Sequence, residues 1–228
     1  MAAPRGRSGT GGEGRLLARP AAPGGRAEPG LHHLPLTGVG ALLYVPAGYR
    51  PDAPAPLVLS LHGAGGNAQG GLSPLRALAD EAGFVLLAVG AVGRTWDVIV
   101  DGYGPDVEAI DEALAHVFGR VAVDAERLVV SGFSDGASYA LSLGITNGDL
   151  FTHVLAFSPG FMAPAAQHGA PRVFISHGTG DRVLPITACS RRLVPMLEKA
   201  GYEVEYREFT GGHTVPPEIA REAVRWMG

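Results

Sequence analysis

The sequence feature that most constrains the fold is the run LVVSGFSDGASYAL at residues 128–141. Apolar, β-branched residues up to Val130 predict a buried strand, and the Ala, Tyr and Leu residues after Gly136 predict a helix. The two segments must join through the tight turn GFSDG, in which a Cβ at Gly132 or Gly136 would meet neighbouring backbone. A Gly-x-Ser-x-Gly turn between a strand and a helix raises the serine hydroxyl above the sheet edge, so Ser134 is a candidate nucleophile.

The rest of the chain alternates β-branched runs with amphipathic segments from about residue 36, which is typical of a mostly parallel α/β sheet. Every gap is short, so we expect no inserted lid or cap domain. The expected helices lie within 72–82, 107–117, 193–200 and 216–224, and Pro195 should kink the third or mark its start. The expected strands are Ala41–Val45, Leu57–Leu61, Phe84–Val89, Arg127–Ser131, Val154–Phe157, Arg172–Ser176 and Glu203–Phe209.

Length and composition describe an ordinary soluble globular chain. Its 228 residues suffice for one domain with a sizeable core, and 46% are hydrophobic while 18% are charged. The net charge of −4 gives no reason to expect nucleic acid or an anionic membrane as a partner. No apolar run approaches the roughly 20 residues of a membrane span. The single cysteine, Cys189, is expected to be a small buried hydrophobe.

The first 30 residues differ from the rest, because they are rich in Gly, Ala, Pro and Arg and nearly lack large hydrophobes. Such a segment cannot bury enough apolar surface to offset its ordering entropy, so we expect a mobile tail at 1–30 and a single domain at 31–228. The tail lacks the apolar core of a signal peptide, which makes a cytoplasmic location the expectation. Gly9–Gly14 formally matches a dinucleotide fingerprint, but no strand precedes it and no helix pattern follows.

Two further loops supply partners for Ser134. Asp181 follows the expected strand Arg172–Ser176, and His213 follows the last expected strand on a Gly-Gly loop. Parallel strands end at one edge of the sheet, where open α/β sheets place their chemistry, so the three loop tips should meet there. His213 would take the proton of the serine hydroxyl as it attacks, and Asp181 would orient the imidazole and stabilise its charged form.

The loop after the strand Leu57–Leu61 reads HGAGGN, and its small side chains leave its N–H groups uncovered. The backbone N–H groups of Ala64 and Asp135 are therefore expected to form an oxyanion hole. His62 is interpreted as a hydrogen-bonded residue that fixes this loop rather than as a metal ligand. The other histidines lack metal-ligand spacing and there is no Gly-rich phosphate loop with a following Lys, so neither a metal nor a nucleotide cofactor is expected.

Four motifs in this order carry a resemblance to a known family: HGAGG at 62–66, GFSDG at 132–136, HGTGD at 177–181 and GGH at 211–213. They resemble the α/β-hydrolase superfamily, and more narrowly its small lidless phospholipase/carboxylesterase branch, which includes acyl-protein thioesterases. The HGAGGN loop is also similar to that of polyhydroxybutyrate depolymerases and feruloyl esterases. The resemblance covers about residues 38–228. It implies an α/β-hydrolase fold and serine-dependent hydrolysis of carboxylic esters through an acyl-enzyme, without a cofactor.

The substrate is less constrained. Without a lid we expect an exposed site for short-chain acyl or aromatic esters, taken as small molecules. Thioesterases of the branch usually carry Gln after the nucleophile, where this chain has Asp135. An acyl thioesterase, an amidase and a polyester or feruloyl-type esterase remain alternatives, as does a hydrolase-fold binding module without chemistry. Four residues beyond strand ends either line the substrate pocket or simply pack the loops: Trp96, Phe161, Met162 and Leu184.

Overall fold

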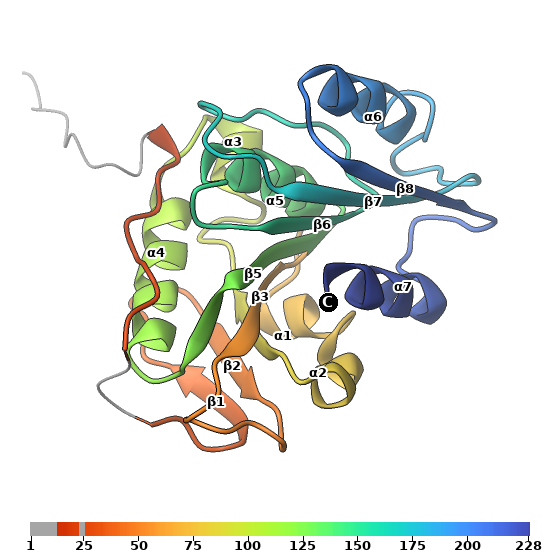
Figure 1. The fold of residues 1–228 in the computed structure, drawn as a ribbon. Helices are drawn as coiled ribbons and strands as arrows, with labels where there is room; N and C mark the ends of the chain where they lie inside the picture. Colours follow the sequence, from red (N-terminus) through yellow and green to blue (C-terminus); the bar gives the residue numbers. More distant parts are fainter. Residues whose placement is uncertain (1–12, 23–25) are drawn as a thin grey trace, which may run out of the picture.

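The computed structural model describes residues 13–22 and 26–228, which build one eight-stranded sheet between two layers of helices (Figure 1). The strands are β1 Gly30–Leu34, β2 Ala41–Val45, β3 Ala55–Leu61, β4 Val85–Val89, β5 Val123–Phe133, β6 His153–Phe157, β7 Arg172–Gly178 and β8 Val204–Phe209. Their order across the sheet is β1-β2-β4-β3-β5-β6-β7-β8. β1 and β2 run antiparallel to their neighbours, and every pair from β4 to β8 is parallel. This sheet confirms the expected fold class.

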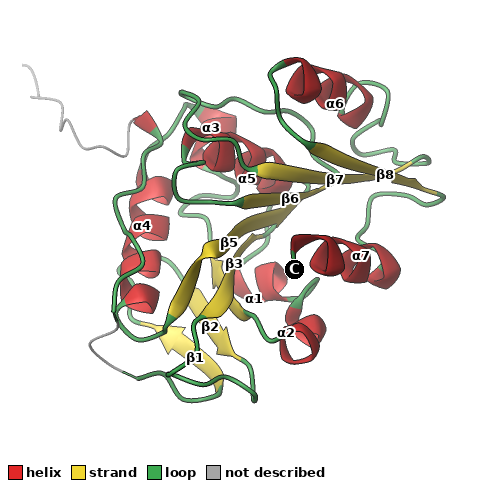
Figure 2. Cartoon of the chain, in the orientation of Figure 1, coloured by secondary structure: helices red, strands yellow, loops and turns green. Residues whose placement is uncertain are grey.

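Helices cover both faces of the sheet (Figure 2). They are α1 Ala68–Leu72, α2 Arg76–Ala82, α3 Asp97–Val100, α4 Pro105–Phe118, α5 Asp135–Thr146, α6 Ser190–Lys199 and α7 Pro217–Met227. The buried residues of α1, α2 and α7 belong to one hydrophobic cluster, and those of α4, α5 and α6 to the other. Among the described residues, no helix has the length and apolar character that crossing a membrane requires.

Side chains alternate between these two clusters along each central strand. In β3, Leu57 and Leu59 pack on the α4–α5 side, whereas Val58 packs on the α1–α7 side. The same alternation holds in β4, where Leu86 packs on the α1–α7 side and Leu87 on the α4–α5 side. Both faces of these strands are therefore buried, which is why they read as continuous apolar runs in the sequence.

The structure differs from the expected elements in a few places. β1 and the short helices α1 and α3 were not expected. β1 is an edge strand whose side chains are largely exposed or half-buried, so it lacks the apolar run of the central strands. β5 begins at Val123 rather than Arg127. Pro195 does not mark the start of α6, which runs from Ser190 through the proline to Lys199. Burial of Leu197 and its apolar neighbours on this helix offsets the hydrogen bond that the proline nitrogen lacks.

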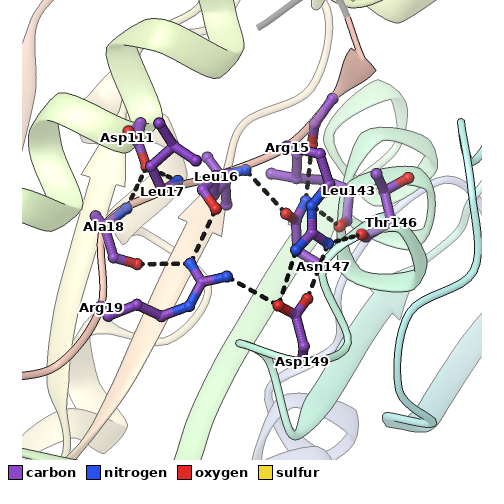
Figure 3. A network of polar contacts seen from close by, with 11 residues as sticks. Arg15, Leu16, Leu17, Ala18, Arg19, Asp111, Leu143, Thr146, Asn147 and Asp149 are labelled. Atoms are coloured by element: carbon purple, nitrogen blue, oxygen red, sulfur yellow. Dashed lines mark hydrogen bonds and ion pairs between the residues drawn. The ribbon is translucent and has the colours of Figure 1, made fainter. Parts of the chain in front are cut away.

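Residues 13–22 do not form the mobile tail expected from composition. They lie along α4 and the C-terminal end of α5 (Figure 3). The side chain of Leu16 is fully buried, and the N–H groups of Leu17 and Ala18 donate to one carboxylate oxygen of Asp111 at 2.7 and 2.8 Å. Residues 1–12 and 23–25, and with them most of the fingerprint-like Gly9–Gly14 motif, lie outside the described residues.

Asn147, just after α5, is a buried polar anchor of this segment (Figure 3). Its side-chain oxygen accepts from the N–H of Leu16 at 2.9 Å, and its amide nitrogen donates to the carbonyl of Gly14 at 2.8 Å. The same nitrogen donates to the carbonyl of Leu143 within α5 at 2.9 Å. Asn147 is fully buried, so its substitution would leave these backbone groups unpaired away from water.

Asn147→Ala is therefore expected to lower the free energy of unfolding by about 2–3 kcal/mol, because each orphaned buried polar group costs about 1–3 kcal/mol. For a chain of this size that corresponds to a fall in Tm of roughly 5–10 °C, measurable by circular dichroism. Asn67→Ala is the matched control, because the exposed Asn67 side chain makes a single capping bond to the N–H of Gly70 and should cost only about 1 kcal/mol. Equal melting temperatures for the Asn147 variant and the wild type would contradict the anchoring role.

Candidate active site

The turn between β5 and α5 holds Ser134 in a conformation that few side chains adopt. Its φ and ψ are 58° and −121°, and a positive φ is uncommon for any residue other than glycine. A Cβ on Gly132 would overlap the carbonyl of Gly136, and one on Gly136 would overlap the carbonyl of Leu61. The N–H of Ser134 is held by the carbonyl of Phe157 on β6 at 2.9 Å. The two glycines thus allow the backbone approach that lifts the Ser134 hydroxyl off the sheet.

Two neighbouring loops bring Asp181 and His213 to the same edge. Asp181 follows β7 and His213 follows β8. The loops are tied together, because the N–H of Gly180 donates to the carbonyl of Gly211 at 2.8 Å. A Cβ on Gly178 would overlap the carbonyls of the Gly211-Gly212 turn, so this close approach also requires glycine. The three residues expected to meet at the sheet edge therefore do so.

The three side chains form a continuous hydrogen-bonded chain. His213 Nε2 lies 2.8 Å from Ser134 Oγ, and His213 Nδ1 lies 2.6 Å from Asp181 Oδ2. Since a carboxylate oxygen only accepts, Nδ1 carries the ring proton and Nε2 is free to accept from the serine hydroxyl. The Asp181 side chain is fully buried, whereas that of His213 retains 14% exposure. This arrangement can move a proton from Ser134 to His213.

The environment of Asp181 keeps it ionised. Its Oδ1 accepts the N–H groups of Val183 and Leu184 at 2.8 and 2.9 Å. Burial by itself raises the pKa of Asp181, but the hydrogen bonds from Leu184, His213 and Val183 outweigh burial and bring this pKa below its ordinary value. A negative charge therefore faces the Nδ1 edge of the His213 ring.

His177, in the HGTGD motif, also contacts Asp181, a role that motif reasoning did not assign. Its Nε2 donates to the carbonyl of Leu184 at 2.8 Å and lies 3.2 Å from Asp181 Oδ2, while Ser190 Oγ lies 2.6 Å from Nδ1. The ring is fully buried, and burial lowers the pKa of His177. The neutral ring with its proton on Nε2 satisfies every contact. The sequence feature that could have indicated this contact is the position of His177 directly after the buried residues of β7.

The loop after β3 lies against the serine. A Cβ on Gly63 would sit 3.3 Å from the Cβ of Ser134. The N–H groups of Gly65 and Gly66 donate to the carbonyls of Arg94 and Gly63, whereas among the described residues no acceptor is found for the N–H of Ala64. Asp135 is the first residue of α5, so its N–H has no partner within the helix. Both groups expected to form an oxyanion hole thus have unused donors.

Residues 91–97 support this loop from behind. The N–H of Ala91 donates to His62 Nε2 at 2.9 Å, and His62 Nδ1 donates to the carbonyl of Gly63 at 2.7 Å, so His62 fixes the loop as expected. Thr95 Oγ1 donates to the side chain of Asp135 at 2.6 Å. Trp96 donates its ring N–H to the carbonyl of His62 at 2.9 Å and is fully buried. The expectation that Trp96 lines a substrate pocket is therefore wrong, because its ring is stacked inside the core against Tyr139.

The other three expected pocket residues are half-buried in neighbouring loops. The N–H of Phe161 donates to Ser138 Oγ at 3.3 Å, and Met162 packs against the α4–α5 cluster. Leu184 packs over Gly160, since a Cβ there would lie 3.3 Å from the leucine methyl group. These contacts place the three residues in the loops after β6 and β7, and contact with a substrate stays a prediction.

A cleft of about 530 Å³ opens beside His213, which is one of its lining residues. It lies where α7 faces α1 and α2 (Figure 1). Its walls include Phe133, whose ring centroid is 4.7 Å from that of His213, and Val215. Sequence reasoning missed this cleft, because its walls come from elements that are distant in the chain and meet only in the folded structure.

The sequence profile of the phospholipase/carboxylesterase family matches residues 107–226, more than half of the chain. The chain is 33% identical over 156 residues to the NocK protein of Nocardia uniformis subsp. tsuyamanensis, covering 61% of this chain and 45% of that protein. It is 27% identical over 153 residues to feruloyl esterase C of Emericella nidulans, covering 64% and 56%. The chain thus spans about half the length of the curated relatives it matches.

Among solved structures, S-formylglutathione hydrolase (FrmB) of Staphylococcus aureus superposes with a TM-score of 0.71 at 13% identity. The superposition covers 90% of this chain and 98% of that one. A likeness at this identity shows the fold alone, which is the α/β-hydrolase fold. Because the family profile extends over more than half of the chain, the protein belongs to the phospholipase/carboxylesterase family of α/β-hydrolases.

Proposed function

We propose that this protein is a serine carboxylesterase in which Ser134 is the nucleophile, His213 the general base and Asp181 the residue that orients it. The observation that carries the proposal is the chain of hydrogen bonds of 2.8 and 2.6 Å from Ser134 Oγ through His213 to Asp181. Family membership and the name of feruloyl esterase C support the same class of reaction. No cofactor takes part in the proposed reaction.

Acylation begins when Ser134 Oγ attacks the ester carbonyl carbon. His213 Nε2 accepts the hydroxyl proton, and the ionised Asp181 stabilises the imidazolium that forms. The carbonyl oxygen becomes an oxyanion that accepts from the N–H groups of Ala64 and Asp135. A donor of this kind typically lowers the barrier by about 3 kcal/mol.

The intermediate collapses when the bond to the alcohol oxygen breaks. His213 passes its proton to that oxygen, so a neutral alcohol leaves and the acyl group remains on Ser134. In deacylation a water molecule takes the alcohol's place, gives its proton to His213 and releases the carboxylic acid. The same three residues therefore act twice, and the serine regains its proton at the end.

The proposed substrates are short-chain acyl or aromatic esters. Phe161, Met162 and Leu184 are proposed to contact the acyl half, because their loops adjoin Ser138 and Asp181 and none of the three lines the cleft at α7. Thioesters are the second class to test, and we place them behind oxygen esters because Asp135 stands where thioesterases of the branch usually carry Gln.

A matched set of butyryl compounds tests the proposal. The purified protein is expected to hydrolyse p-nitrophenyl butyrate with a higher kcat/KM than butyryl thioesters or butyryl anilides. A fluorophosphonate probe should modify Ser134, as located by peptide mass spectrometry. A preference for the thioester would instead make the protein a thioesterase. Absence of both turnover and labelling would favour a binding module that keeps the Gly-x-Ser-x-Gly turn only for packing.

A further inference from the structure

The cleft beside His213 has one chemical asymmetry. Near the catalytic residues its surface is apolar, from Phe133 and Val215, and Leu78 on α2 adds a further apolar wall. On α7 the lining residues Pro217, Ala220 and Arg221 share one helix face. Arg221 is thus a fixed positive charge on the wall of an apolar cleft that opens onto His213.

The cleft lies on the alcohol side of the proposed reaction. Of the described residues, those lining it include Phe133, His213 and Val215, whereas the loop that carries Ala64 contributes none. Because His213 must protonate the departing oxygen, the part of the ester attached to that oxygen lies next to His213. The cleft is therefore positioned to hold the alcohol half.

The guanidinium of Arg221 is available for a ligand. Among residues 13–22 and 26–228 no carboxylate lies within ion-pairing distance of it. Glu222, the next residue, forms an ion pair of 2.5 Å with Arg207. A planar guanidinium binds a carboxylate through two parallel hydrogen bonds, which gives it direction as well as charge.

We propose that the cleft selects esters whose alcohol half is a compact apolar or aromatic group ending in an anionic substituent, with Arg221 binding the anion. The proposal rests on the proposed carboxylesterase function and adds the substrate class to it. The apolar walls hold the ring or short chain, and Arg221 fixes its outer end so that the ester oxygen lies at His213. The enzyme would then distinguish esters by whether the outer end of the alcohol half carries a negative charge.

Two pairs of esters distinguish binding of an anion on the alcohol half from binding of an anion on the acyl half. The first pair is 4-acetoxybenzoate and its neutral isostere 4-acetoxybenzamide, which differ in charge on the alcohol half only. The second is phenyl hydrogen succinate and phenyl succinamate, which differ in charge on the acyl half only. The kcat/KM ratio of each pair is measured in the wild type, in Arg221→Ala and Arg221→Lys, and in Arg225→Ala as a control on the same helix.

For the acetate pair, Arg221→Ala is expected to lower the charged-to-neutral ratio about tenfold relative to wild type, as expected for loss of a partly exposed charge-assisted contact. Comparing ratios between variants cancels the different reactivities of the two leaving groups. Arg221→Lys should keep part of the preference, because it keeps the charge but not the paired donors. Arg225→Ala should leave both ratios unchanged, and added salt should reduce the wild-type ratio.

An unchanged acetate ratio in Arg221→Ala, with both esters still hydrolysed, would overturn the inference and leave the carboxylesterase function standing. A change in the succinate ratio instead would overturn the assignment of the cleft to the alcohol half. Failure of the wild type to hydrolyse any of the four esters, including the neutral ones, would count against the proposed function itself.

Discussion

Ser134→Ala is expected to reduce kcat/KM for p-nitrophenyl butyrate by about 10⁴- to 10⁶-fold, the range seen when the nucleophile of a serine triad is removed. Alanine also has a Cβ, so the steric cost of holding φ at 58° is the same as for serine and the turn should persist. Ser134 is 8% exposed, and removal of its hydroxyl alone takes away no packing contact that the fold needs. Stopped assays at high enzyme concentration, with thermal melting alongside, measure both effects.

Ser131→Ala is the matched control for that experiment. Ser131 lies on β5, three residues before Ser134, is 1% exposed, and has a hydroxyl without a hydrogen-bond partner in the described structure. Its replacement should leave turnover within about twofold and should not lower stability, because no hydrogen bond is lost. Turnover in Ser134→Ala close to that of the control would remove Ser134 from the mechanism.

Asp181→Asn is expected to lower kcat by about 10³- to 10⁴-fold, because the substitution selects the wrong tautomer of the histidine. The asparagine oxygen would keep the bonds from Val183 and Leu184, which turns its NH₂ group toward His213. His213 Nδ1 must then accept, so Nε2 carries the proton and cannot act as a base toward Ser134. The pre-steady-state rate of acylation, measured by stopped flow, reports this step directly.

Asp111→Asn provides a comparable change away from the site. One carboxylate oxygen of Asp111 likewise accepts two consecutive N–H groups, from Leu17 and Ala18, and the residue lies on α4. An amide can preserve both bonds, so activity should stay near wild type. If Asp181→Asn retained more than a tenth of wild-type kcat, His213 would not depend on Asp181 for its orientation.

The site was predictable where local chemistry dictates it. Gly132 and Gly136 lie so close to neighbouring backbone that no other residue fits, and the sequence therefore shows this turn directly. The loops of the site could also be predicted, because each begins where an apolar strand ends. The meeting of Asp181 and His213 followed from the parallel sheet, whose strands end at one edge. Such signals depend on neighbours in the chain or on sheet topology alone.

What could not be predicted depends on pairings between distant segments. The composition of residues 13–22 is that of a disordered tail, yet Leu16 is buried because Asn147, 131 residues away in the chain, satisfies its backbone. Trp96 has the residue type of a pocket wall, but a carbonyl acceptor at His62 and a stacking partner hold it in the core. The cleft at α7 requires three helices whose approach no single motif encodes.

The positive φ of Ser134 has a consequence for how this protein can be improved as a catalyst. A residue held there costs on the order of 1–3 kcal/mol, and glycine would relax that cost while abolishing the hydroxyl. Selection for heat resistance alone would therefore favour the loss of chemistry at this position. Thermal robustness must instead be engineered elsewhere, and the docking of residues 13–22 offers a place where stiffening leaves the reacting atoms untouched.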